Sequence, residues 1–151
     1  MVETTVLRDP TDIAATVHSA LAAQPVHTHC YAPVFGSSPD PEGLLLWGID
    51  ELVTYHYLVA EVFRVVPATE LPYEDFWRME KSARADHIWK HLFVERTPIS
   101  EAARGVVTTL QRLGLNPAEP DLEPYRRWFA EQNPDAYIDR VMALANVDEI
   151  V

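Results

Sequence analysis

Two histidines separated by one residue, His27 and His29, form the sharpest chemical pattern in the sequence. In a strand, residues i and i+2 point to the same face, so both imidazoles would lie on one side. Two neutral imidazoles make half of a divalent metal site, and the end of a barrel strand is a common place for such ligands. The alternative is that the spacing arises by chance, or that the two rings form a structural pair.

A second pair, His56 and Tyr57, has the side chains for a proton relay or for a hydrogen bond to a substrate oxygen. The alternative is a core histidine bonded to a backbone carbonyl. His87 and His91 have the i, i+4 spacing of zinc-protease ligands, but the glutamate that this motif requires after the first histidine is missing. A structural role is therefore favoured for them. Cys30 lacks the surroundings of a catalytic nucleophile.

The elements that position these residues follow from prolines, helix caps and apolar spacing. Asp9 and Pro10 are expected to begin an amphipathic helix that ends at Gln24. Its apolar stripe consists of Ile13, Val17, Ala20 and Leu21. Pro25–Tyr31 is short and bounded by prolines, which predicts a brief strand that carries the two histidines.

The remaining segments are predominantly helical. Asp50 is expected to cap one long helix that ends at Pro67, with His56 in the middle of it, on or beside the apolar face. That face is predicted to contain Leu52, Val53, His56, Val59, Ala60 and Phe63. Further elements are expected to be helices at Tyr73–Val94, Ser100–Leu113, Pro124–Glu131 and from Pro134 onwards, and a strand at Val147–Val151.

The composition limits the classes of partner. The chain has 151 residues, with 12 Lys and Arg against 23 Asp and Glu, so its net charge is −11. Such a charge disfavours binding to nucleic acid. One cysteine excludes an internal disulfide framework, and no apolar stretch is long enough to span a membrane. We expect a soluble, cytoplasmic protein with no nucleic acid or membrane partner.

The order of the motifs resembles the N-terminal portion of uronate isomerases, which are metal-dependent enzymes of the amidohydrolase superfamily. The resemblance is carried by PVHTHCY, by GIDELVTYHYLVAEVFR about 25 residues later, and by ADHIWKHLFVERTPIS, in which Trp89, His91 and Leu92 match a Trp-x-His-Leu segment. The terminal ANVDEIV resembles the run into the second barrel strand. The resemblance covers most of Pro25–Val151.

The resemblance implies an α/β fold, namely the N-terminal part of a (β/α)8 barrel with a long helical insertion after the first strand. The 151 residues would form a single, mostly α-helical unit of an incomplete barrel. Residues 1–31 would supply the first helix and strand, 44–146 the insertion and 147–151 the start of the second strand. A complete barrel takes about 250 residues. The fragment is therefore expected to be inactive and to need the missing C-terminal barrel segment or, alternatively, to form a homo-oligomer.

The resemblance also implies the site and its chemistry. His27 and His29 would bind a divalent metal ion, with zinc as the expected ion, and His56 and Tyr57 would face a sugar acid substrate. The reaction would be the aldose–ketose isomerisation of a hexuronate such as D-glucuronate. Two alternatives stay open. One is a metal-dependent hydrolase of the same superfamily, and the other is a non-catalytic, acidic, helical interaction domain.

Overall fold

A computed structural model describes residues 6, 8–23, 26–28 and 48–150, and the chain in it is mostly helical. It divides into two compact units, one made of Met1–Cys30 with Arg140–Val151 and the other of Tyr31–Asp139. No helix in the described ranges is long and apolar enough to cross a membrane.

The first unit contains the helix α1 (Pro10–Ala23) and two short strands, β1 (Val26–Thr28) and β2 (Val147–Ile150). Asp9 begins α1 as expected, because its Oδ1 accepts a hydrogen bond from the Thr11 amide at 2.8 Å. The apolar stripe of α1 is exposed among the described residues. The exposed fraction of its members is 41% for Ile13, 51% for Val17 and 66% for Leu21.

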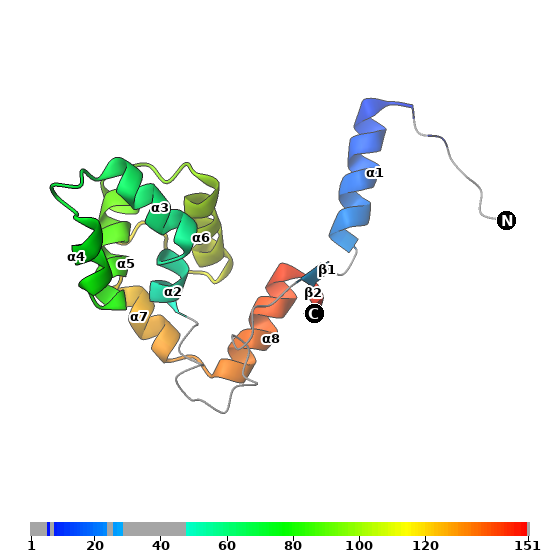
Figure 1. Ribbon diagram of the computed structural model, residues 1–151. Coiled ribbons are helices and arrows are strands. Elements are labelled where there is room, and N and C mark those ends of the chain that lie inside the picture. Colours follow the sequence, from blue (N-terminus) through cyan, green and yellow to red (C-terminus); the bar gives the residue numbers. More distant parts are fainter. Residues whose placement is uncertain (1–5, 7, 24–25, 29–47, 151) are drawn as a thin grey trace. The chain divides into compact units, whose positions relative to one another are not determined.

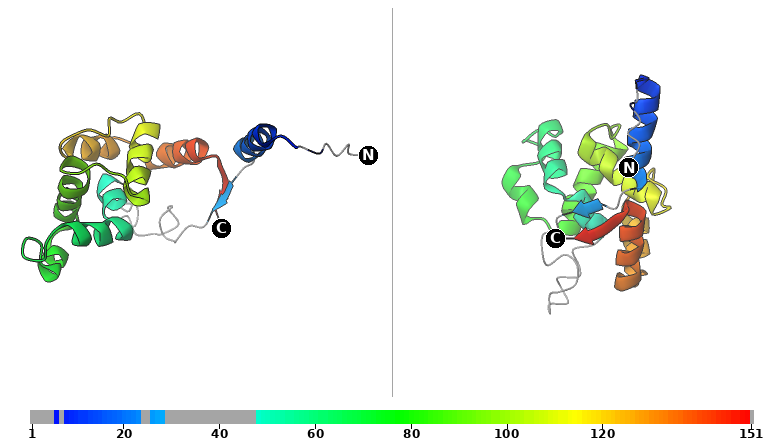
Figure 2. Two further views of the ribbon diagram at one scale, coloured as in Figure 1. Left: turned by 90° about the horizontal axis from the view of Figure 1, so that it is seen from above. Right: turned by 90° about the vertical axis from the view of Figure 1, so that its right-hand side faces the viewer.

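β1 and β2 pair in parallel and lie side by side (Figure 2). Val26 is opposite Val147, and after an irregularity in the register His27 is opposite Glu149. The strands that the sequence predicts at Pro25–Tyr31 and Val147–Val151 are therefore confirmed over the residues that the structure describes. Before β2, the helix α8 (Pro134–Ala145) ends at Asn146, whose φ of 54° is a left-handed conformation that asparagine tolerates well.

The second unit is a cluster of short helices (Figure 1). Its elements are α2 (Ile49–Val53), α3 (His56–Val65), α4 (Tyr73–Arg78), α5 (Lys81–Trp89), the π-helical turn η2 (Lys90–Val94), α6 (Glu101–Arg112) and α7 (Glu123–Ala130). α2 contacts α5 and α7, and α3 contacts α5, η2 and α6. α2 and α3 therefore lie against most of the unit.

Two of the predicted long helices are in fact broken. The helix expected from Asp50 to Pro67 is interrupted at Tyr55, where ψ is 137°, and its N-cap is Gly48 rather than Asp50. The helix expected at Tyr73–Val94 is interrupted where Met79 and Glu80 take extended conformations. Apolar spacing is helical on both sides of each break, so periodicity alone does not reveal the break.

The core of the second unit is aromatic and aliphatic. Its largest fully buried side chains are Trp89, Tyr125, Phe76, Ile49, Leu58, Leu71, Ile88, Leu110, Leu122, Val53 and Val62. The polar tips of its aromatic members are satisfied. Trp89 Nε1 donates to the Glu119 carbonyl at 3.0 Å, and the Tyr125 hydroxyl donates to the Asn116 carbonyl at 2.6 Å. Burial therefore stabilises the unit without leaving these donors unpaired.

α6 begins and ends as its sequence predicts. The Ser100 hydroxyl accepts a hydrogen bond from the Ala103 amide at 3.1 Å, which caps the N-terminus. At the other end Gly114 has a φ of 81°, and the amides of Gly114 and Leu115 donate to the carbonyls of Gln111 and Leu110. This is a Schellman motif, in which a left-handed glycine terminates the helix.

Replacing Gly114 by alanine is expected to lower the free energy of unfolding by about 1 kcal/mol, because a Cβ disfavours the left-handed region. The cost is conformational, since no heavy atom lies within 4 Å of the Cβ position. Denaturant unfolding measures it. Gly105 in α6 is the matched control, because its Cβ position is equally open and alanine is the better helix former there. Equal destabilisation by both substitutions would contradict the explanation.

Candidate functional site

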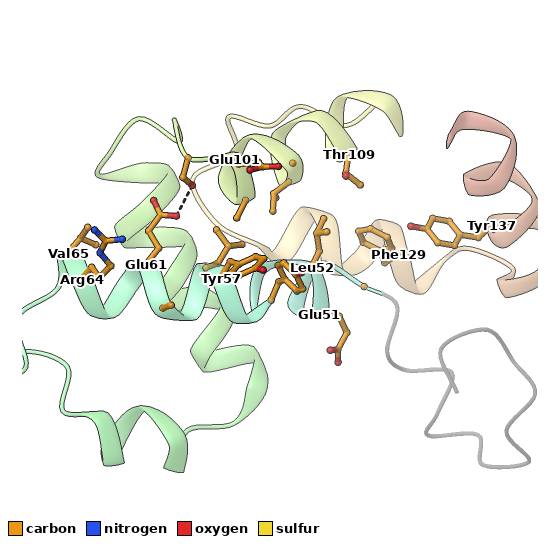
Figure 3. A pocket seen from close by; sticks show the side chains of 18 residues that line it. Glu51, Leu52, Tyr57, Glu61, Arg64, Val65, Glu101, Thr109, Phe129 and Tyr137 are labelled. Carbon is orange, nitrogen blue, oxygen red and sulfur yellow. Dashed lines mark hydrogen bonds between the residues drawn. The ribbon is translucent and has the colours of Figure 1, made fainter. Parts of the chain in front are cut away.

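An open groove of about 1240 Å³ lies in the second unit. α2, α3 and α6 supply most of its lining, and Phe129 of α7 and Tyr137 of α8 complete it at one end (Figure 3). Figure 3 places Tyr57 near the middle of the groove and Arg64 near the other end. Of the residues that the sequence singled out as catalytic, Tyr57 lines this groove and His56 does not.

His56 and Tyr57 are the first two residues of α3. The sequence predicted His56 in the middle of a helix, on or beside its apolar face, and this is wrong, because the break at Tyr55 places the pair at a helix start. Both side chains are exposed, and Tyr57 is 60% exposed. The imidazole and phenol ring centroids are 4.2 Å apart, and Tyr55 lies against both rings at 4.3 and 5.2 Å. The Tyr57 phenol is therefore accessible to a ligand in the groove.

The groove is acidic along α3 and α6. Glu61 lies one turn after Tyr57, and its Oε2 accepts a hydrogen bond from the Ser100 hydroxyl at 2.6 Å (Figure 3). Glu101 also lines the groove, and Glu51 forms an ion pair with Lys81. Arg64, two turns after Tyr57, is the one cationic residue in the described lining. Glu61 lies on α3 and Ser100 caps α6. The sequence predicts Ser100 only as a helix start and does not distinguish Glu61.

The structure describes one of the two predicted metal ligands. His27 is the second residue of β1, and His29 lies outside the described residues. Among the residues that the structure describes, no group of three His, Cys, Asp or Glu could hold a metal ion. His27 belongs to one compact unit and the His56–Tyr57 pair to the other. The metal site stays a prediction.

His87 and His91 form a stacked pair, with ring centroids 5.8 Å apart and planes at 21°. His91 is 4% exposed, and its Nδ1 donates to Glu95 Oε2 at 2.8 Å, while its Nε2 lies 3.9 Å from Glu70 Oε1. The hydrogen bond from His91 lowers the pKa of Glu95. These contacts agree with the structural role that the sequence favours.

The half-buried position of His87 makes its protonation unfavourable. Burial lowers its pKa below the ordinary value of 6.5, and His91 and Lys90 lower it further, whereas Asp86 and Glu70 act in the opposite direction. Its Nδ1 is buried and has no hydrogen-bond partner among the described atoms. The folded chain therefore favours a neutral His87.

Replacing His87 by glutamine is expected to reduce the loss of stability that mild acid causes. As the pH falls through 6.5, the unfolded chain binds a proton at His87 more readily than the folded chain does, so stability falls until the lowered folded pKa is passed. Melting temperatures at about pH 7.5 and about pH 5.5 measure the difference. His18→Gln, at an exposed position of α1, is the control. An unchanged slope in the His87 variant would refute this assignment.

Comparison with known proteins identifies the family to which this chain belongs. No protein-family model and no curated protein sequence matches the chain. Among solved structures, a uronate isomerase from Bacillus halodurans matches 96% of this chain with 46% sequence identity and a TM-score of 0.76. The chain covers 33% of that protein, so it spans about a third of its length. The identity and the shared fold over nearly all of its residues show that this is a uronate isomerase-like chain.

Proposed function

We propose that this chain is part of a metal-dependent enzyme that interconverts the aldose and ketose forms of a hexuronate such as D-glucuronate. The observation that carries the proposal is the 46% identity to a uronate isomerase over 96% of the chain. At such identity the fold is shared, and retention of the reaction class is the simplest expectation. The exposed phenol of Tyr57 in a groove agrees with it.

The proposal includes a (β/α)8 barrel to which β1 and β2 contribute neighbouring strands. Two observations support it. The strands are parallel neighbours whose connection runs through the second unit, and α1 has an exposed apolar stripe of the kind that packs against a barrel sheet. Because the chain spans about a third of the related isomerase, we propose that activity requires a further barrel segment. The 151 residues alone would then be inactive.

His27 and His29 would supply two of the ligands of the metal ion. His27 is in β1, and two neutral imidazoles are the donors that half of a four-coordinate zinc site requires. The described residues hold no group of three donors, so the other ligands would come from outside them. A bound divalent ion supplies Lewis acidity that polarises a substrate oxygen.

The residues of this chain would transfer protons to and from the substrate. Isomerisation moves a hydrogen from C2 to C1 and a hydroxyl hydrogen from O2 to O1, with no net gain or loss of atoms. The Tyr57 phenol both donates and accepts hydrogen bonds, so it can exchange a proton with a substrate hydroxyl. The His56 imidazole, whose ring centroid is 4.2 Å from that of Tyr57, would assist it.

A chimeric enzyme tests the proposal. This chain replaces the matching third of the Bacillus halodurans isomerase, and proton NMR follows D-glucuronate in deuterated water. We expect conversion to the ketose with solvent deuterium incorporated at the transferred position, and no conversion by the 151-residue chain alone. A folded, metal-loaded chimera that leaves glucuronate unchanged would refute the proposal, and hydrolysis of an ester or amide by it would favour a hydrolase.

A further inference from the structure

A single arginine on α7 connects three helices of the second unit. The Arg126 Nε lies 3.0 and 3.2 Å from the two carboxylate oxygens of Asp50 on α2, and its Nη2 lies 2.8 Å from the nearer of them. The same Nη2 lies 2.7 Å from Asp86 Oδ1 and 3.0 Å from the Ser82 carbonyl, both on α5. The fork of the guanidinium thus joins α7, α2 and α5.

The contact between Arg126 and Asp50 is half-buried, whereas the Asp86 side chain is 52% exposed. The side chains of Arg126 and Asp50 are 25% and 26% exposed. Burial by itself lowers the pKa of Arg126, but the hydrogen bonds that its guanidinium donates to Asp50 and Asp86 outweigh it and raise the pKa above its ordinary value. The guanidinium therefore stays charged and keeps its donors for these contacts.

α2 depends on such contacts because it has only five residues. A helix of this length is not stable in isolation, so tertiary contacts must hold it. Ile49 and Val53 provide the apolar part, with 1% and 0% of their surfaces exposed, and Asp50 provides the ionic part. α2 is therefore fixed on one side by the core and on the other by Arg126.

The position of α2 determines where α3 begins. The Thr54 hydroxyl donates to the Asp50 carbonyl at 2.6 Å, and the Tyr55 carbonyl accepts the amides of Leu58 and Val59 at 2.9 and 3.1 Å. Asp50 is thus connected to the first turn of α3 by a hydrogen-bonded link only a few residues long. Tyr57, within that turn, is exposed, and its ring lies against those of its neighbours Tyr55 and His56, so the backbone of this turn sets its place in the groove.

We propose that Arg126 is a positioning residue, which fixes the junction between α2 and α3 and so holds the Tyr57 phenol in the groove. Arg126 itself does not line the groove. The role of Tyr57 in this proposal rests on the proposed function. The connection from Arg126 through Asp50 to the junction of α2 and α3 rests only on the contacts described above.

Hydrogen exchange on the 151-residue chain tests the connection. In Arg126→Gln we expect the amides of Thr54, Leu58 and Val59 to exchange at least about tenfold faster, while amides in the middle of α6 keep their rates. Arg127→Gln is the matched control, because this neighbour on α7 is exposed. Unchanged exchange at the junction, or an equal rise throughout the second unit, would overturn the proposal, since the latter indicates a merely structural contact.

A double-mutant cycle in the chimeric isomerase tests whether Arg126 affects turnover through Tyr57. Arg126→Lys keeps the charge but loses the fork, and we expect it to lower kcat about tenfold with KM unchanged. In a Tyr57→Phe background the same substitution should have no further effect, because the phenol on which it acts is gone. If Arg126→Lys and Tyr57→Phe lower kcat independently, so that their effects multiply, the proposal is overturned. If the parent chimera has no isomerase activity, the proposed function fails, and hydrogen exchange alone decides the role of Arg126.

Discussion

Replacing His27 and His29 together by alanine is expected to remove the metal from the chimeric isomerase and to abolish turnover. Two of the ligands are lost, and the remaining ones cannot complete a closed coordination shell. We expect the metal content to fall below roughly a tenth of the unsubstituted value and kcat to fall by more than about a hundredfold, because a metal contributes several kcal/mol to such reactions. Elemental analysis and the NMR assay measure both quantities.

His18→Ala is the matched control for this pair, because His18 is an exposed histidine of the same compact unit. It should leave metal content and turnover unchanged. Should the double variant keep its full metal content, His27 and His29 would not be ligands, and the metal-dependent reaction would lose its support from this chain. Circular dichroism shows whether a loss of metal is due to the missing ligands or to unfolding. If only the ligands are lost, the helices of the second unit should be retained.

Replacing Tyr57 by phenylalanine is expected to lower kcat by about a hundredfold while the metal content stays the same. The substitution removes one hydroxyl, and positioned proton transfer contributes on the order of 10² to 10⁴ in rate. Tyr57 is 60% exposed, so the loss of the hydroxyl costs no core packing and should leave the melting temperature unchanged. Steady-state kinetics, metal analysis and thermal unfolding give the three readouts.

Tyr55→Phe is the control for Tyr57, because Tyr55 lines the same groove, is 48% exposed and lies 5.2 Å from Tyr57. It should change kcat by less than about threefold, since no proton transfer is assigned to it. Equal losses in the two variants would show that the aromatic cluster matters as a surface rather than through the Tyr57 hydroxyl. Normal turnover in Tyr57→Phe would make this residue structural.

The sequence predicted the local features of the fold well. Asp9 and Ser100 begin their helices, Gly114 ends α6, and short strands form at both predicted positions. The helix starts and the helix end depend on hydrogen bonds or backbone preferences within a few residues, which the local sequence contains. The strand partner of Val26, by contrast, is Val147, and the sequence suggests such a pairing only through the resemblance to a barrel.

The candidate site was predicted less completely. Tyr57 was singled out and does line the groove, whereas His56 lies outside the lining, and the pairing of Glu61 with Ser100 in the groove was not foreseen. Acidic side chains are frequent on helix surfaces, so Glu61 does not differ in the sequence from an ordinary solvated residue, and Ser100 is recognisable only as a helix cap. Their pairing spans 39 residues and becomes visible only when α3 and α6 lie side by side.

The sequence by itself therefore determined the caps of α1 and α6, the positions of the two short strands and the resemblance to uronate isomerases, because these features are specified by adjacent residues. It did not determine the cap of α2, which is Gly48 and not Asp50. Only the tertiary structure decided where the long helices break, that Tyr57 opens α3 on a groove, and that Arg126 reaches Asp50 across 76 residues. The physical reason is that these features depend on contacts between distant segments. Such contacts form only where chain folding brings the segments together, and they override the helical preference of each segment on its own.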